Sequence, residues 1–118
     1  MEDSCVLILE NLIKLTRSSE NQFKRGNFKV ALDEKMKANA ILKSKSFSKK
    51  MIQNYRKELS SLYSSKFDLI FDHKLKIDEI KINKIVKMLE LKSEEKLKNL
   101  DYKGAIKALR RAEKYMSN

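Results

Sequence analysis

The chain has 118 residues, of which 42% are hydrophobic and 36% are charged, and its formal net charge is +11. This length allows one domain or one array of small helical units and leaves no room for a second independent core. Two glycines and no proline argue against turn-rich β-sandwiches, and strongly against a glycine-rich phosphate-binding loop. We therefore expect one all-α domain of about five helices over residues 1–118.

The positive charge is spread along the chain and comes mainly from lysine. The sequence holds 22 Lys and 5 Arg against 16 acidic residues, and both halves of the chain carry an excess of basic residues. Lysine acts as a point charge, whereas arginine supplies the planar fork that reads bases or clamps phosphate. Much of this charge fits the Lys-, Ile- and Asn-rich composition that an AT-biased genome produces. An acidic protein or peptide is the first partner that we expect, and nucleic acid is the second.

Residues 1–43 are predicted to form a first helical hairpin. Apolar residues at helical spacing predict one helix over about 4–24 and a second over about 28–43. Gly26 can adopt the left-handed conformation that ends the first helix, and Asn27 can cap the second. So short a junction predicts that the two helices run antiparallel.

A linking segment, residues 44–76, follows, and it begins with a polar loop around Phe47. A third helix, longer than its neighbours, is predicted from about 49 to 71, with an extended conformation over 69–77 as the alternative. Its apolar stripe is unsuited to water, so we expect this helix to be the buried spine of a monomer. The contacts expected on the spine come from Leu12, Phe28, Val86 and Leu109. If the stripe is left uncovered, the chain forms a homodimer instead.

Residues 77–118 are predicted to form a second hairpin, with helices over about 77–99 and 102–116. The sequence of the first hairpin repeats here at an offset of 74 residues. The clearest matches pair Ser19 with Ser93, Asn27 with Asp101, Ala31 with Ala105, and Ala38 with Ala112. Alanines seven residues apart allow two helix backbones to approach closely, so we expect Ala31 and Ala112 at close helix contacts.

This pattern resembles the tetratricopeptide repeat, a hairpin with a small residue in its first helix, a Gly-Asp/Asn-Tyr/Phe turn, and alanines flanking an aromatic residue in its second helix. The matching residues are Ser19, Gly26, Asn27, Phe28, Ala31 and Ala38 in the first unit, and Ser93, Asp101, Tyr102, Ala105, Leu109 and Ala112 in the second. Leu100 replaces the turn glycine of the second unit, and Lys35 stands where the first should have a large apolar residue. The resemblance implies a non-enzymatic adaptor or scaffold that binds a peptide or partner helix.

Two surfaces are candidates for binding. The resemblance implies a concave face between the first helices of the hairpins, whose polar residues suit an acidic peptide. Its candidate residues are Lys14, Arg17, Gln22, Lys84, Lys87 and Asn99. A second, basic surface suits a polyanion and comprises Lys43, Lys45, Lys49, Lys50, Arg110 and Arg111. Phe47 lies in the basic loop, where it either stacks on a base or, as we predict, packs inward.

The residues needed for catalysis or metal binding are scarce. Cys5 and His73 are the only cysteine and histidine, so neither an internal disulfide nor a cysteine-based zinc site is possible. We predict no enzyme, no cofactor and no metal. Acidic residues at positions 2 and 3 are unlike a signal peptide, and no apolar stretch approaches the roughly 20 residues of a membrane span. We therefore expect a cytoplasmic protein with no membrane partner.

Overall fold

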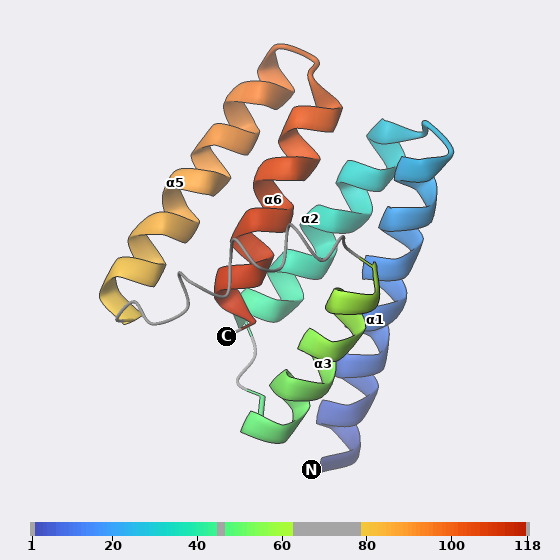
Figure 1. The fold of residues 1–118 in the computed structure, drawn as a ribbon, viewed down its shortest axis with the longest axis vertical. Coiled ribbons are helices and arrows are strands. Elements are labelled where there is room, and N and C mark those ends of the chain that lie inside the picture. The colour runs from blue at the N-terminus through green and yellow to red at the C-terminus, as the bar shows by residue number, and fades with distance from the viewer. Residues whose placement is uncertain (1, 45–46, 63–78, 118) are drawn as a thin grey trace.

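The computed structural model describes residues 2–44, 47–62 and 79–117. These residues form five helices and no strand, which confirms the all-α prediction (Figure 1). The helices are α1 (Glu2–Lys24), α2 (Phe28–Ser44), α3 (Lys49–Leu62), α5 (Glu79–Lys98) and α6 (Tyr102–Met116). Four of them agree with the predicted ranges to within about two residues. The third is predicted to continue to about residue 71, but 63–78 lie outside the described residues, as does the whole of the extended alternative over 69–77.

Both hairpins have the same turn, although only the first has a glycine in it. Gly26 takes a φ of 84°, and Leu100, the corresponding residue of the second hairpin, takes a φ of 60°. A left-handed conformation costs a residue with a side chain roughly 1–2 kcal/mol. Asp101 follows and caps α6, because its side chain accepts a hydrogen bond from the Gly104 backbone N–H at 2.9 Å. The backbone of the turn is therefore repeated even where the sequence departs from the pattern.

The repeat also extends to a buried hydrogen bond. The Ser19 hydroxyl of α1 donates to the Ala31 carbonyl of α2 at 2.6 Å, and Ser93 of α5 donates to Ala105 of α6 at 3.1 Å. The four matched alanines are fully buried; they are Ala31, Ala38, Ala105 and Ala112. Close helix contacts were predicted for Ala31 and Ala112, and each packs in an apolar cluster shared by two helices, Ala31 with Ala105 of α6 and Ala112 with Val86 of α5.

The two hairpins meet through their second helices. Both turns lie at the same end of the molecule, so α2 and α6 run parallel at its centre, with α1 and α5 at opposite edges (Figure 1). Ala31 and Leu32 of α2 share one apolar cluster with Ala105, Ile106 and Leu109 of α6. The small side chains let these two helices touch directly, and no space for a spine is left between the hairpins.

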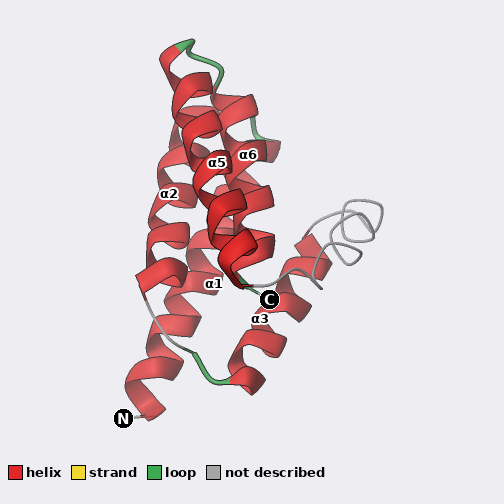
Figure 2. Cartoon of the chain, turned by 90° about the vertical axis from the view of Figure 1, so that its left-hand side faces the viewer, coloured by secondary structure: helices red, strands yellow, loops and turns green. Residues whose placement is uncertain are grey.

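Over its described residues, the third helix is therefore not the expected central spine. Of the four expected contacts, only Leu12 packs with Tyr55 and Leu59 of α3, whereas Phe28, Val86 and Leu109 belong to other apolar clusters. α3 lies along α1 instead, beside the half that is nearer the N-terminus (Figures 1 and 2).

A buried polar cluster joins α1, α2, α3 and α6. Lys35 of α2 forms an ion pair with Glu113 of α6, and both side chains are almost completely buried. The Tyr55 hydroxyl of α3 donates to the same carboxylate, and the Thr16 hydroxyl of α1 lies 3.0 Å from that of Tyr55. Burial lowers the pKa of Lys35, and the adjacent carboxylate opposes this shift. Burial, followed by the charge of Glu113, raises the pKa of Tyr55 well above its usual value.

This cluster follows the internal repeat. Lys35 and Leu109 are equivalent positions of the two hairpins, and so are Asn39 and Glu113, by the 74-residue offset. The Lys35–Glu113 contact therefore has a symmetry-related counterpart between Asn39 and Leu109. That counterpart exists, since the Asn39 side-chain amide donates to the Leu109 carbonyl at 3.0 Å. The hairpins are thus related by an approximate two-fold axis, because exchanging them maps one contact onto the other.

Enlarging the alanines at the hairpin contacts should destabilise the fold. We expect Ala31→Leu and Ala112→Leu each to lower the free energy of unfolding by about 1–3 kcal/mol, because no space is available beside either residue. Urea unfolding followed by circular dichroism measures the change. Ala40→Leu, at an exposed position of the same helix as Ala31, is the matched control and should shift the value by less than about 0.5 kcal/mol. Equal effects at buried and exposed positions would contradict this packing.

Removing one member of the buried ion pair should cost more than removing both. Lys35→Met leaves Glu113 with a buried charge that lacks its cation, so we expect a loss of about 3–5 kcal/mol. The double variant Lys35→Met with Glu113→Leu should recover part of that loss. Unfolding of the wild type, both single variants and the double variant gives the coupling free energy. Losses that add within about 0.5 kcal/mol would show that the two charges do not interact.

Candidate binding groove

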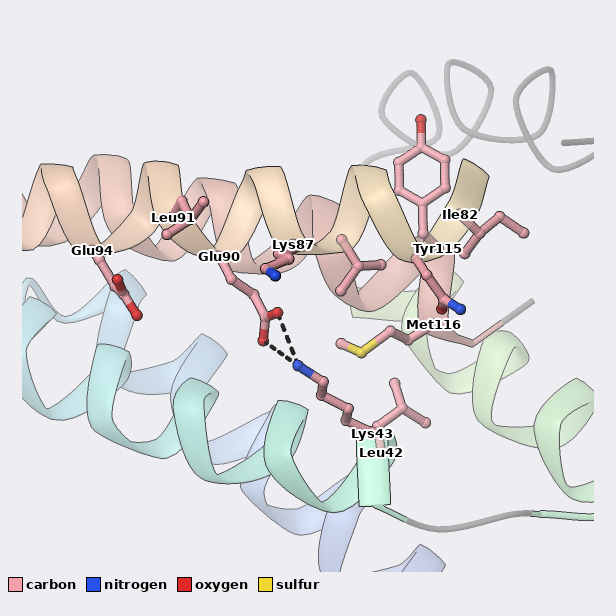
Figure 3. A pocket seen from close by; sticks show the side chains of 11 residues that line it. Leu42, Lys43, Ile82, Lys87, Glu90, Leu91, Glu94, Tyr115 and Met116 are labelled. Atoms are coloured by element: carbon pink, nitrogen blue, oxygen red, sulfur yellow. Dashed lines mark hydrogen bonds and ion pairs between the residues drawn. The ribbon is translucent and has the colours of Figure 1, made fainter. Parts of the chain in front are cut away.

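An open groove lies between α2 and α5, with the end of α6 as its floor (Figure 3). Its volume is about 940 Å³. It is lined by Leu42, Lys43, Ile82, Asn83, Val86, Lys87, Glu90, Leu91, Glu94, Tyr115 and Met116. The groove exists because the hairpins meet through α2 and α6, which holds α5 on the far side of α6 (Figure 1). We call this feature the α2/α5 groove.

The α2/α5 groove has an apolar floor and charged walls. Leu42, Val86 and Tyr115 are buried, and Met116 is half-buried beside them. The ammonium of Lys43 on α2 donates to the carboxylate of Glu90 on α5, with N–O distances of 3.0 and 3.3 Å (Figure 3). Lys43 is largely exposed, and an ion pair of this kind contributes little to stability. A ligand can therefore displace it at low cost.

The candidate residues for an acidic peptide do not gather on one face. Lys14, Arg17 and Gln22 lie on α1, at the opposite edge of the molecule from α5. Lys84 and Lys87 lie on α5, and only Lys87 lines the groove.

Two of the candidates on α1 also have partners within the chain. Arg17 forms an ion pair with Glu58 of α3, and Gln22 accepts a hydrogen bond from the Asn27 amide at 2.9 Å. Asn99 is exposed in the turn after α5. The packing of the hairpins through their second helices separates their first helices, and this separation divides the predicted surface.

The candidate residues for a polyanion are also dispersed. Arg110 is half-buried, forms an ion pair with Glu20 and lies 4.2 Å from the centre of the Phe23 ring. Its guanidinium therefore helps to hold α6 against α1. Lys43 lines the groove, Lys49 and Lys50 are exposed at the start of α3, Arg111 is exposed on α6, and Lys45 lies outside the described residues. Phe47 packs against the apolar cluster of α1, α2 and α3, as predicted.

The exposed apolar residues of α5 were not predicted from the sequence. Met88 is 68% exposed and Leu91 is 57% exposed, and Ile80 is exposed near the start of the same helix. In the sequence they continue the helical pattern of a buried face, and only the position of α5 at an edge leaves them in water. Val86 and Ser93 are buried and mark the inner face of α5. Once that face is known, the spacing of Met88 and Leu91 places them on the opposite, exposed side of the helix.

Within the described ranges, no three His, Cys, Asp or Glu side chains come together in a group that suits a metal ion. None of the helices that the structure describes has an apolar stretch of the length that crossing a bilayer requires.

One amine is chemically distinctive, because the pKa of Lys114 is lowered to about 8 by burial and then by the charges of Arg56 and Lys35.

The lowered pKa of Lys114 can be tested directly. A titration of the lysine side chains by NMR should give a pKa of about 8 for Lys114. Arg56→Met removes one of the positive charges and should raise that value toward 10.5. Unfolding restores the ordinary pKa, so the unfolded chain binds more protons between about pH 8 and 10.5. The contribution of Lys114 to stability should therefore rise with pH through this window. An unchanged pKa in the variant would contradict the proximity of Arg56.

No match emerged from comparisons of the chain with protein-family models, curated proteins and solved structures. The resemblance of the two hairpins to tetratricopeptide repeats therefore stays a prediction from the sequence pattern. What the protein binds has to be inferred from the groove and its charges.

Proposed function

We propose that the protein is a non-enzymatic adaptor or scaffold that binds an amphipathic helix of a partner protein in the α2/α5 groove. The observation that carries this proposal is the groove itself, which combines an apolar floor with charged walls and an open mouth. Its volume of about 940 Å³ lies in the range of about 300–1,000 Å³ that is common for ligand sites. A helix laid between two helices is a recurrent mode of peptide recognition.

The apolar floor of the groove requires a partner helix that presents a stripe of apolar side chains. Leu42 comes from α2, Val86 from α5 and Met116 from α6, so apolar side chains of a bound helix would meet three elements at once. Methionine adapts its shape to different apolar surfaces. Burial of apolar area would provide most of the binding free energy, and the charged walls would orient the partner.

The positive charge of the chain favours a partner helix with acidic residues beside its apolar stripe. A net charge of +11 attracts acidic proteins over long distances and speeds their association. Lys43 and Lys87 stand on opposite walls of the groove, where they can pair with acidic residues beside the apolar stripe of the partner. The tetratricopeptide-like hairpins support the same class of function, although the groove here differs from a concave face of first helices. We also propose a cytoplasmic location, in keeping with the single cysteine.

Binding of designed peptides tests this proposal. The probe is a fluorescent peptide of about 15 residues, roughly four helical turns, with a leucine stripe flanked by glutamates. We expect it to bind, and a scrambled peptide of the same composition to bind much more weakly. Lys43→Glu should weaken binding about three- to tenfold, because the new carboxylate faces both Glu90 and the peptide.

The matched control is Lys29→Glu, which makes the same charge change at an exposed position of α2 outside the groove. It should leave the affinity nearly unchanged. NMR shift changes on peptide addition should concentrate on groove residues. Equal effects of the two variants, or tighter binding of a DNA duplex than of the peptide at physiological salt, would contradict the proposal and favour nucleic acid.

A further inference from the structure

The outward face of α5 carries a second feature, which borders the α2/α5 groove and shares only Leu91 with it. This helix packs on α6 and forms an edge of the molecule, so its far side faces water (Figure 1). Met88 and Leu91 stand on that side, 68% and 57% exposed. Lys84 and Glu95 are exposed on either side of them along the helix. We call these four residues the α5 seam.

The α5 seam has the spacing of a coiled-coil interface. Its positions follow one another at intervals of four, three and four residues, which is the pattern of alternating a and d positions in a heptad repeat. Met88 and Glu95 occupy a positions, and Lys84 and Leu91 occupy d positions. The centre of the seam is therefore apolar, and its two ends carry opposite charges.

We propose that the α5 seam pairs with the α5 seam of a second copy of this chain, with the two helices antiparallel. In an antiparallel pair each a position faces a d position. Met88 then meets the second copy's Leu91, and Lys84 meets the second copy's Glu95. The two-fold axis repeats both contacts, so two apolar contacts lie between two pairs of opposite charge.

The charges specify the orientation. A parallel pair would place Lys84 opposite Lys84 and Glu95 opposite Glu95, and both contacts would repel. The antiparallel pair also brings Lys87 of one copy near Glu94 of the other, at positions that flank the seam. Self-complementarity of this kind identifies a second copy as the occupant of the seam, rather than an unrelated basic or acidic helix.

The dimer should be weak and reversible. Each copy contributes the exposed face of one helix, which is less than the area that stable protein complexes usually bury. At the ends of the pair, Lys81 approaches the second copy's Lys98, and these two charges repel. Each copy also carries a charge of +11, so measurements belong at about 0.15 M salt, where screening confines repulsion to about 8 Å.

Charge reversal at the seam provides the test. Sedimentation equilibrium of the wild-type chain up to millimolar concentration should show a mass rising from 13.9 kDa toward twice that value. Lys84→Glu and Glu95→Lys should each remain monomeric, because each places like charges opposite one another. A mixture of these two variants should form heterodimers, and the double variant in one chain should regain homodimerisation.

The matched controls make the same charge changes elsewhere on exposed helix positions, as Lys107→Glu on α6 and Glu10→Lys on α1. They should dimerise like the wild type. A wild-type chain that stays monomeric, or a dimer that survives Lys84→Glu and Glu95→Lys equally well, would overturn the proposal. Lys84 and Glu95 do not line the α2/α5 groove, so both seam variants should still bind the designed peptide whether or not the chain dimerises.

Discussion

The fold is organised around one buried ion pair. Lys35 and Glu113 come from the two hairpins, and the carboxylate also accepts a hydrogen bond from Tyr55 of α3. One acidic side chain thus fixes three elements relative to one another, with Thr16 of α1 beside them. Burying the two charges is costly, and only the complete set of partners compensates for it. The position of α5, and with it the α2/α5 groove, follows from this arrangement because α5 packs on α6.

The local features of the fold were predictable from the sequence. The helix ends at Gly26 and Asp101 and the buried alanines of both hairpins follow from short patterns, whose physical cause lies within a few residues. The 74-residue repeat likewise predicted the small residues at which the two helices of each hairpin pack together. Such features need no knowledge of distant contacts, because capping, turn geometry and close helix packing act locally.

The contacts between hairpins were not predictable in the same way. Lys35 stands at a position where the repeat pattern has a large apolar residue. Its partner, Glu113, lies 78 residues away, so the pattern within one helix could not predict the ion pair. The apolar stripe of α3 suggested a central position, but direct contact of α2 with α6 leaves α3 at the side of α1. The candidate binding residues failed to form one surface for the same reason. Met88 and Leu91 became noticeable only once α5 was known to be an edge helix.

The approximate two-fold relation between the hairpins makes their pairing selective. Two copies of the first hairpin, joined in the same way, would place Lys35 against Asn39 and bury an ammonium without a carboxylate. Two copies of the second would place Glu113 against Leu109 and bury a carboxylate without a cation. Only the unlike combination neutralises both charges. The ion pair therefore makes the pairing of the first hairpin with the second more favourable than the pairing of either hairpin with a copy of itself.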